Sequence, residues 1–366
     1  MIKSFDEVFE DVTKLGVKIK TDEYHPIGKY QIIDQGQEAV AGYSDLEDGV
    51  FENVPAIVFG DHTRIVKYVD QPFFLGADGV KVLRSRFKDA NYRYLYYALK
   101  SVKIPNTGYN RHFKWLKEAK IYYPNSEEQS KIVLILDEIS SVIEHRQRQL
   151  QKLDELVKAR FIEMFGDPVD NDRAWATETL NSVCSTIVDC PHSTPSYTSD
   201  NTGYMCIRTS IVKKNHIMWD DIEYIPEQEY YQRIQRKRPE RGDIIYTREG
   251  AILGIAAMID RECNVALGQR SMLLSPNAYK CLPQFLSAAM NFDSFLRKVL
   301  GGVSGSASPH INVGDIKAFA IILPPIELQE QFAAFIEQTD KSKVAIQKAL
   351  DEAQLLFDSL MQKYFG

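Results

Sequence analysis

The 366-residue sequence has few of the features that mark a secreted or membrane protein. Its five cysteines are a sparse, odd number for so long a chain, which argues against a disulfide framework and favours reduced thiols. It contains no apolar run of about 18 residues, and no charged segment followed by a short apolar one. We therefore expect a cytoplasmic protein without a membrane span or a secretory signal.

The sequence also lacks the motifs of the enzymes that it could most simply be. There is no Gly-x-Gly-x-x-Gly after a predicted strand, no Walker loop, and no Asn/Asp-Pro-Pro-Tyr/Phe of the kind that holds an adenine amine. Cys184, Cys190 and His192 lie close together, but their spacing is not that of a zinc knuckle. We predict that the chain is not an enzyme and holds no cofactor or metal of its own.

Composition and charge fit a globular protein with a localised basic surface. Hydrophobic residues make up 44% and charged residues 26%, and the length favours two or more domains. The net charge of −6 excludes a simple polycation, yet the segment 230–241, YYQRIQRKRPER, is basic. Such a patch can bind phosphate, although a solvated helix face has the same composition.

One short sequence motif occurs twice in the chain. IYYPNSEEQ at 121–129 and IILPPIELQ at 321–329 share Ile, Pro, Glu and Gln at matching positions, 200 residues apart. The alignment continues without a gap to Phe-Gly at both 165–166 and 365–366. A repeat of such a long period indicates a duplicated unit made of a domain and a connector, rather than a solenoid.

Each copy of the repeat predicts a strand, a proline turn and a long helix. Proline ends the preceding structure, and glutamate stands where the positive end of a helix dipole favours acid. Apolar residues then recur at alternating steps of three and four, as in a coiled coil. The first seam comprises Ile132, Ile135, Ile139, Ile143, Leu150, Leu153, Val157 and Met164, and the second comprises Phe332, Phe335, Thr339, Ile346, Leu350, Ala353, Phe357, Leu360 and Tyr364. Some positions in the apolar stripe are polar in one copy and apolar in the other. Such complementary differences favour two helices that pack on each other rather than each on a copy of itself.

The regions before the two repeats have the same order of elements with different surface residues. Short β-type runs broken by turns come first, then a helix near 91–102 or 283–300, then a polar segment. We expect a first target-binding domain at 1–120, a spacer at 121–166, a second domain at 167–320 and a second spacer at 321–366. Two similar scaffolds with different loops would bind two targets, or two parts of one.

This layout resembles the specificity subunit of type I restriction-modification systems. LPPIELQEQ (323–331) and PNSEEQ (124–129) are similar to the start of that family's conserved regions. VFGDHTRIVKYVDQPFFLGADGVKVL (58–83), DCPHSTP (189–195), CIRTS (206–210) and GDIIYTREG (242–250) resemble a common form of its target recognition domain. The resemblance covers nearly the whole chain. Because the chain begins almost directly with the first domain, any conserved segment before it is expected to be short.

The resemblance implies a non-catalytic subunit that reads double-stranded DNA. Each recognition domain would read one half of a split site, and two long antiparallel helices would span the unread gap. Two modification subunits would dock on this frame and methylate adenine with S-adenosylmethionine, and a restriction subunit can join them. The fold it implies is α+β: two α/β target recognition domains with pseudo-twofold symmetry, joined by two coiled-coil helices.

Candidate DNA contacts follow from the chemistry of base edges and phosphates. Arg and Lys suit guanine, Asn and Gln suit adenine, and hydroxyl and basic groups suit phosphate. In the first domain the candidates are His62, Thr63 and Arg64, then Tyr109, Asn110, Arg111 and His112. In the second they are Arg208, Thr209, Thr247, Arg248, Gln269, Arg270, Ser304, Ser306 and His310, with Lys213, Lys214, Arg236, Lys237 and Arg238 assigned to phosphate.

Several alternatives remain open at this point. The GDHT segment at 60–63 could be a turn whose histidine caps a strand, and GGVSGSAS at 301–308 could be a flexible linker. The whole chain could be a coiled-coil adaptor whose end domains bind proteins and read no DNA. It could also be a solitary specificity subunit whose partners are absent.

Overall fold

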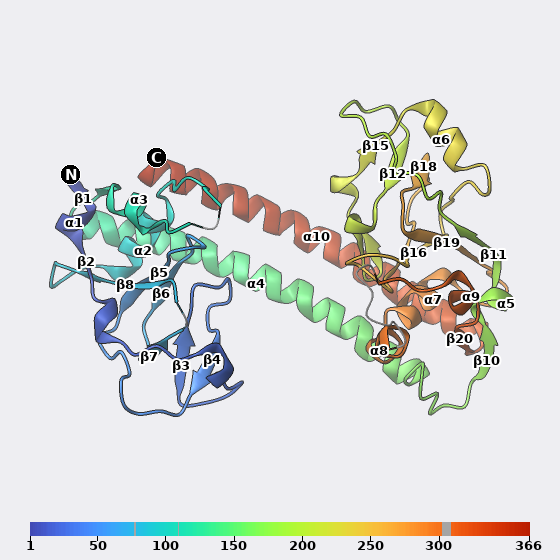
Figure 1. The fold of residues 1–366 in the computed structure, drawn as a ribbon, viewed down its shortest axis with the longest axis horizontal. Helices are drawn as coiled ribbons and strands as arrows, with labels where there is room; N and C mark the ends of the chain where they lie inside the picture. Colours follow the sequence, from blue (N-terminus) through green and yellow to red (C-terminus); the bar gives the residue numbers. More distant parts are fainter. Residues whose placement is uncertain (77, 109, 302–308) are drawn as a thin grey trace. The chain divides into compact units, whose positions relative to one another are not determined.

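The computed structural model describes residues 1–76, 78–108, 110–301 and 309–366 (Figure 1). It forms two compact units, one of Met1–Gln147 with Gln347–Gly366 and the other of Arg148–Ile346. Two 40-residue helices, α4 (Ser126–Phe165) and α10 (Ile326–Phe365), belong to both units. Each unit thus contains the first part of one long helix and the last part of the other, running in opposite directions. This confirms the predicted antiparallel pair.

The first unit contains a four-stranded and a three-stranded sheet, packed with short helices. Its strands are β1 (Ile2–Ser4), β2 (Phe9–Asp11), β3 (Tyr30–Ile33), β4 (Gly42–Ser44), β5 (Ala56–Gly60), β6 (Val66–Val69), β7 (Phe73–Leu75), β8 (Val80–Ser85) and β9 (Lys120–Tyr122). Its α-helices besides the shared ones are α1 (Phe5–Val8), α2 (Tyr92–Lys100) and α3 (Phe113–Lys117), and Thr13–Leu15 and Thr21–Glu23 form 3-10 turns.

The second unit is built in the same way. Its strands are β10 (Ala176–Thr179), β11 (Cys184–Asp189), β12 (Met205–Ile207), β13 (Val212–Lys213), β14 (His216–Ile217), β15 (Glu223–Tyr224), β16 (Ile244–Thr247), β17 (Ala256–Met258), β18 (Val265–Leu267), β19 (Ser271–Pro276) and β20 (Ala320–Leu323). Its α-helices are α5 (Leu180–Val183), α6 (Glu227–Arg233), α7 (Pro283–Met290), α8 (Asp293–Gly301) and α9 (Val313–Lys317), and Thr209–Ile211 and Trp219–Asp221 form 3-10 turns.

The strand order of the two units is identical, which confirms the predicted duplication. The four-stranded sheets run β2-β8-β5-β6 and β11-β19-β16-β17, and the three-stranded sheets run β4-β3-β7 and β15-β12-β18. In both three-stranded sheets the central strand is antiparallel to one neighbour and parallel to the other. Antiparallel pairs β1-β9 and β10-β20 lead into the long helices. Equivalent positions can therefore be assigned from strand register.

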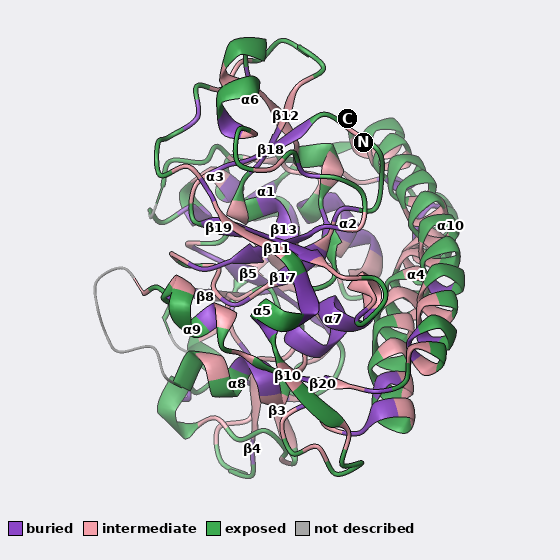
Figure 2. Cartoon of the chain, turned by 90° about the vertical axis from the view of Figure 1, so that its right-hand side faces the viewer, coloured by how far each residue is buried: buried purple, intermediate pink, exposed green. Residues whose placement is uncertain are grey.

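The long helices show the same burial pattern in both copies. Along 141–160 and 341–360 the buried, half-buried and exposed positions match, except that Phe357 is more buried than Val157. Exposed residues follow the outer faces of α4 and α10 (Figure 2). One seam residue was predicted wrongly: Ile135 is 39% exposed, whereas Leu136 is buried in the first unit's core. The helical period places 136, not 135, four residues after the buried Ile132.

The repeated motif forms a buried turn at the start of each long helix. The side-chain amide of Gln129 donates to the carbonyl oxygen of Pro124 at 2.9 Å, and Gln329 makes the same 2.9 Å hydrogen bond to Pro324. Both glutamines are buried. The carbonyl groups of Pro124 and Pro324 precede the helices and, within the described residues, accept no main-chain hydrogen bond from them, so at a buried position they need another donor. The shared Pro and Gln thus have one structural explanation.

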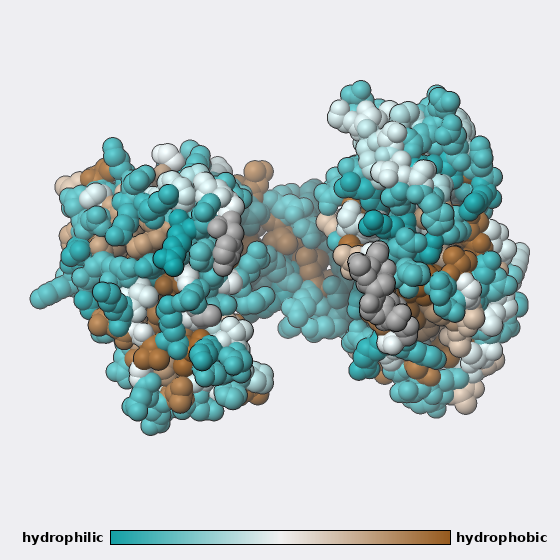
Figure 3. Space-filling view, viewed as in Figure 1, coloured by the Kyte–Doolittle hydropathy of each residue, from teal (hydrophilic) through white to brown (hydrophobic). Residues whose placement is uncertain are grey.

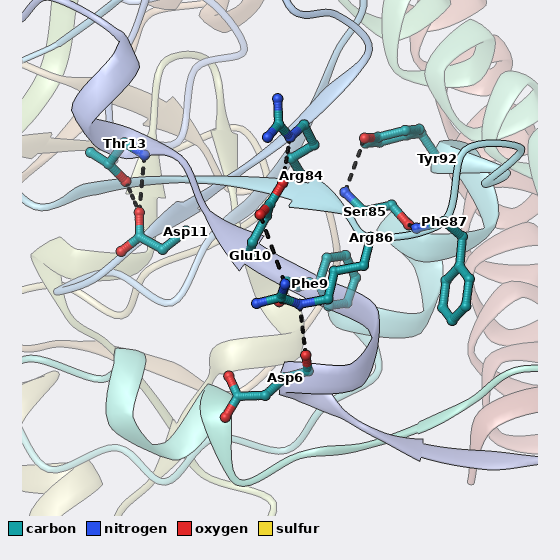
Figure 4. A network of polar contacts seen from close by, with 10 residues as sticks. All are labelled: Asp6, Phe9, Glu10, Asp11, Thr13, Arg84, Ser85, Arg86, Phe87 and Tyr92. Carbon is teal, nitrogen blue, oxygen red and sulfur yellow. Dashed lines mark hydrogen bonds and ion pairs between the residues drawn. The ribbon is translucent and has the colours of Figure 1, made fainter.

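Edge strand β2 is held to β8 by charged groups, shown in Figure 4. Arg84 Nε donates to Glu10 Oε1 at 2.6 Å, and Arg86 Nε donates to the carbonyl oxygens of Asp6 at 2.8 Å and Phe9 at 3.2 Å. Arg86 and the end of β8 lie at the opposite end of the sheet from Gly60, which pairs with Val80. These two arginines serve the fold.

Candidate nucleic-acid interface

Loops from several strands of the first unit meet at one end of its two sheets. Gly76, after β7, donates its N–H to the carbonyl oxygen of Ile33 at the end of β3, at 2.8 Å. Asp61, after β5, donates to Gly79 at 2.7 Å, and its own carbonyl accepts from the N–H of His112 at 2.7 Å. Residues distant in sequence thus form one surface.

The second unit makes the same three main-chain hydrogen bonds at equivalent positions. Gly268 donates to Ile207 at 2.8 Å, Arg248 donates to Arg270 at 3.0 Å, and Ile311 donates to Arg248 at 2.9 Å. The loops that carry most of the predicted contacts therefore converge in both units. The face visible in Figure 3 is mainly hydrophilic over each unit.

In the first unit, Gln35 holds two of these loops together. Its Oε1 accepts the N–H of His62 at 3.1 Å, its Nε2 donates to the carbonyl oxygen of Asp78 at 3.0 Å, and its own carbonyl accepts from the Thr63 hydroxyl at 2.6 Å. His62 is half-buried and Thr63 exposed, so both present groups to solvent. His62 Nδ1 also lies 3.2 Å from the carbonyl oxygen of Asn110.

The segment 110–112 divides into two exposed residues and one buried residue. Asn110 and Arg111 are exposed. His112 is fully buried, its Nδ1 lies 3.0 Å from the carbonyl oxygen of Asp61, and the carboxylate of Asp61 accepts the N–H of Phe113 at 2.8 Å. A side chain enclosed in this way presents no atom to DNA. The structure therefore places His112 in the support, contrary to the sequence-based expectation; Tyr109 lies outside the described residues.

In the second unit, a buried arginine organises the equivalent surface. Arg248 is 6% exposed and donates from Nε to Asp189 Oδ1 at 2.9 Å and from Nη2 to Asp189 Oδ2 at 3.2 Å. Its Nη2 is also 2.8 Å from Glu249 Oε1. Thr247 is fully buried, and its hydroxyl accepts the N–H of Ile255 at 2.9 Å. These two predicted contacts are part of the scaffold, because their polar groups are already occupied inside the fold.

Other groups around Asp189 remain accessible. His192 Nε2 lies 3.2 Å from Asp189 Oδ2 with a side chain that is 66% exposed, and Arg236 donates to the carbonyl oxygen of Asp189 at 3.2 Å. Gln269 donates from Nε2 to the carbonyl oxygen of His192 at 2.9 Å, which leaves its Oε1 as a free acceptor in the described hydrogen-bond network. Arg270 is exposed. Basic and amide side chains are therefore accessible at this edge of the unit, next to the carboxylate of Asp189.

The remaining predicted residues of the second unit lie in different environments. Arg208 is exposed but its Nε is 2.8 Å from Glu223 Oε2, and its guanidinium stacks on Tyr197. Thr209, which is half-buried, starts the next 3-10 turn. His310 is exposed, whereas Ser304 and Ser306 lie outside the described residues.

The predicted phosphate-binding residues do not form one patch of free charges. Lys214 pairs with Asp293 on α8 at 3.2 Å, and Lys237 pairs with Glu240 at 3.0 Å and with Asp243 at 3.3 Å. Lys213 donates to a main-chain carbonyl, that of Ser210, at 2.9 Å, and Arg238 donates to the side-chain oxygen of Asn264 at 3.0 Å. Pairing with carboxylates lowers the affinity of Lys214 and Lys237 for an added phosphate.

Two arginines at the interface have a backbone conformation that favours glycine. Arg64 has φ 65° and Arg270 has φ 68°. By strand register, Arg64 corresponds to Gly254, with φ 80°, and Arg270 corresponds to Gly79, with φ 92°. Left-handed φ is uncommon for side chains other than Asn, Asp and His, and it costs conformational energy. Each unit thus has one arginine in a strained conformation where the other unit has a glycine.

The sequence reasoning missed Gln35 and Asp189. Strand register makes Gln35 the counterpart of Thr209, which was predicted, but no motif marks QIIDQG at 31–36. Asp189 opens DCPHSTP, a segment noted only for its family resemblance. The internal duplication was the available signal, because it maps predicted residues of one unit onto the other.

The chain is thus a duplicated protein of two α/β units with one topology. In each unit polar loops gather at one end of the sheets, and the two long helices contribute to both units. The family model of the type I restriction modification DNA specificity domain matches residues 1–155 and 173–354. The chain belongs to this family. Among the described residues, no helix is both long and apolar enough to cross a membrane.

Individual relatives are distant. The type I restriction enzyme MjaIX specificity subunit of Methanocaldococcus jannaschii is 22% identical over 275 residues, which are 68% of this chain and 60% of that protein. The Escherichia coli EcoR124I/EcoR124II specificity subunit is 26% identical over 147 residues, 37% of this chain and 36% of that protein. The match therefore spans about three fifths of the first relative and about a third of the second.

A solved structure shares the fold over the full chain. The S subunit of a type-I restriction-modification system from M. genitalium superposes with a TM-score of 0.58, covers 100% of this chain and 96% of that one, and is 17% identical. At this identity the likeness concerns the fold.

Proposed function

We propose that this chain is a non-catalytic specificity subunit that recognises a bipartite, asymmetric DNA site. The observation that carries the proposal is the contrast between the two units. Equivalent loops converge in both, held by matched main-chain hydrogen bonds, but their side chains differ: Gln35 and His62 in one unit correspond in place to Thr209 and Glu249 in the other. Different donors on one scaffold select different bases.

We assign base and phosphate contacts to the accessible residues of each interface. In the first unit these are His62, Thr63, Arg64, Asn110 and Arg111. In the second they are Arg208, Thr209, Gln269, Arg270, Arg236 and His310, with His192 added. Exposed or half-buried donors can reach a groove, whereas the buried His112, Thr247 and Arg248 fix the loops that carry them. The long-range positive electrostatic potential comes in part from Lys213, Lys214, Lys237 and Arg238.

We further propose that the recognition domains are 1–120 and 167–320, and that the long helices bind two modification subunits. Apolar side chains remain exposed along these helices, among them Leu134 at 70% and Leu355 at 73%. Exposed apolar groups on a rigid helix favour a protein partner. S-adenosylmethionine would bind the modification subunit, and a restriction subunit can join the complex. We place this assembly in the cytoplasm.

The test is to express the chain with the modification subunit encoded beside it and to map N6-methyladenine in the host DNA. One gapped, asymmetric motif should appear only when this chain is present. A palindromic motif would contradict the two-half-site proposal. If the modification subunit co-purified but no motif appeared, the chain would be a scaffold without DNA reading, and if neither occurred, a protein adaptor.

A further inference from the structure

A cleft of about 570 Å³ opens on the first unit beside the turn after β5. Its lining includes three cations, Arg64 from that turn, Lys100 at the end of α2 and Lys103 three residues beyond it, with Tyr96 and Val66 as neighbours. Lys100 Nζ lies 5.7 Å from the ring centre of Tyr96. Three positive charges on one concave surface repel each other unless an anion joins them.

None of these three cations forms an ion pair within residues 1–76, 78–108, 110–301 and 309–366. Their neighbours in the same unit behave differently, since Lys67 pairs with Asp34 and Arg93 pairs with Asp137. Within the described residues the Arg64 side chain makes one long hydrogen bond, of 3.4 Å from Nη1 to the carbonyl oxygen of Ile104, and its buried Nε has no partner. The cleft therefore holds cations that no carboxylate of the described residues neutralises.

The second unit has no cation at any of the three equivalent positions. Arg64 corresponds to Gly254, because Arg64 N–H donates to Gly60 and Gly254 N–H donates to Thr247 before equivalent strands. The helix ends at Ser101 and Asn291 align, which matches Lys100 with the buried Met290 and Lys103 with Asp293.

Helix α8 covers the equivalent position in that unit. A Cβ added to Gly254 would lie 3.4 Å from Leu296 and 3.7 Å from Leu300, both on α8. The basic cleft is thus absent from the shared scaffold and specific to the first unit. An arginine with φ 65° at a position where glycine fits indicates that its side chain has been kept for a reason other than stability.

We propose that Arg64, Lys100 and Lys103 bind a phosphate of the DNA backbone flanking the half-site read by the first unit. The inference rests on the proposed function, because the cleft adjoins the turn that carries His62 and Thr63. Clustered Arg and Lys supply affinity by releasing counterions and do not read sequence. The second unit has no counterpart, so the two half-sites would be held with unequal affinity.

The experiment measures binding of the complex to a duplex that carries the mapped methylation motif, as a function of salt. The variants are Lys100→Gln with Lys103→Gln, Arg64→Gly alone, and Lys88→Gln as the control. Lys88 is exposed and follows β8 at the opposite end of the sheet from Gly60. Arg64→Gly suits the left-handed backbone, so its melting temperature should not fall.

Because one phosphate contact is at stake, we expect the double variant to bind about 5-fold more weakly at about 0.15 M salt, with a salt slope lower by about 0.9, and Arg64→Gly to bind more weakly by a smaller factor. The loss should be equal for cognate and unrelated duplexes. A double variant that behaves like Lys88→Gln on a duplex bound by the wild type overturns the cleft assignment and leaves the proposed function intact.

Two further results also overturn the inference. If no motif can be mapped and the wild type binds no duplex, the proposed function fails and this inference fails with it. If the double variant loses affinity for ATP or inorganic phosphate, each tested separately, but retains that for DNA, the cleft takes free phosphate compounds instead of the backbone.

Discussion

The guanidinium of Arg248 lies against the carboxylate of Asp189 with two nitrogen–oxygen contacts, at 2.9 and 3.2 Å. Asp189 ends β11 and Arg248 directly follows β16, the two strands that flank β19 in the sheet, and both side chains are largely shielded from solvent. The pair fixes the turn after β16, on which Arg270 and Ile311 also depend through main-chain hydrogen bonds. It is therefore a support for the interface, placed under the exposed donors.

Replacing Asp189 with Asn should weaken this support. The buried guanidinium keeps Glu249 as a partner but loses its main carboxylate, so we expect the free energy of unfolding to fall by about 1–3 kcal/mol. Urea denaturation measures the change, with Asp200→Asn, an exposed aspartate of the same unit, as control. Equal midpoints for the two variants would contradict the role given to the pair.

Alanine substitutions at the adjacent residues His112 and Arg111 should affect different properties, the first mainly stability and the second mainly DNA binding. His112→Ala removes a buried ring and its hydrogen bond to Asp61, and should cost about 2–4 kcal/mol of folding free energy. Arg111→Ala, on an exposed side chain, should leave stability within about 0.5 kcal/mol and weaken DNA binding. Thermal unfolding and DNA titration of both variants distinguish a residue that stabilises the fold from one that contacts DNA. Equal stability losses would refute the distinction.

Arg270→Gly tests a base contact without straining the backbone. Because φ is 68° and the counterpart Gly79 is a glycine, the variant should fold normally. We expect a loss of about 1–3 kcal/mol against the cognate duplex and a relaxed preference at one base position. A methylation map made with the variant reports that position. An unchanged motif at unchanged affinity would remove Arg270 from the interface.

The buried turn at the start of α10 predicts a stability effect with a close control. Gln329→Ala leaves the carbonyl oxygen of Pro324 and the N–H of Leu282 without their partner, which should cost about 2–3 kcal/mol. Gln331→Ala, exposed on the same helix, should change little. Chemical denaturation compares the stability of the two variants directly. Similar midpoints would contradict the role given to the buried glutamine of the repeated motif.

Acid should weaken the contact between α8 and its surroundings. Hydrogen bonds from Lys158, and then from Lys214, lower the pKa of Asp293 below its ordinary value. A carboxyl group with a lowered pKa stabilises the fold above its unfolded pKa, near 4, and loses that contribution as pH falls through the folded value. Asp293→Asn should thus lower the urea midpoint near pH 7, and this difference from the wild type should shrink as the pH falls below about 4. A difference that stays the same, or grows, on acidification would contradict this.

The architecture could be predicted from sequence because its signals are local and doubled. Pro124 with Gln129, and Pro324 with Gln329, mark the helix starts, and the 3.6-residue period gives all but one residue of the seams. The exception, Ile135, lies beside the buried Leu136 in a run of apolar residues, IVLIL, where several faces of a helix are apolar.

The interface could be predicted only in outline. The residues predicted from sequence lie mostly in loops that converge in each unit, but which of their side chains are buried depends on contacts between segments that are far apart in the sequence. Asp189 and Arg248 are 59 residues apart, and Asp61 and His112 are 51 apart. No local pattern distinguishes Arg248, which is enclosed, from Arg270, which is exposed.

The division of the long helices sets an order in which the chain can be completed during synthesis. The second unit is one continuous stretch, Arg148–Ile346, whereas the first needs residues 347–366 to join 1–147. Phe357 and Leu360 pack on the core that contains Tyr97 and Leu136. The unit that leaves the ribosome first is therefore the last to complete its fold, and its apolar surface stays open until α10 has emerged.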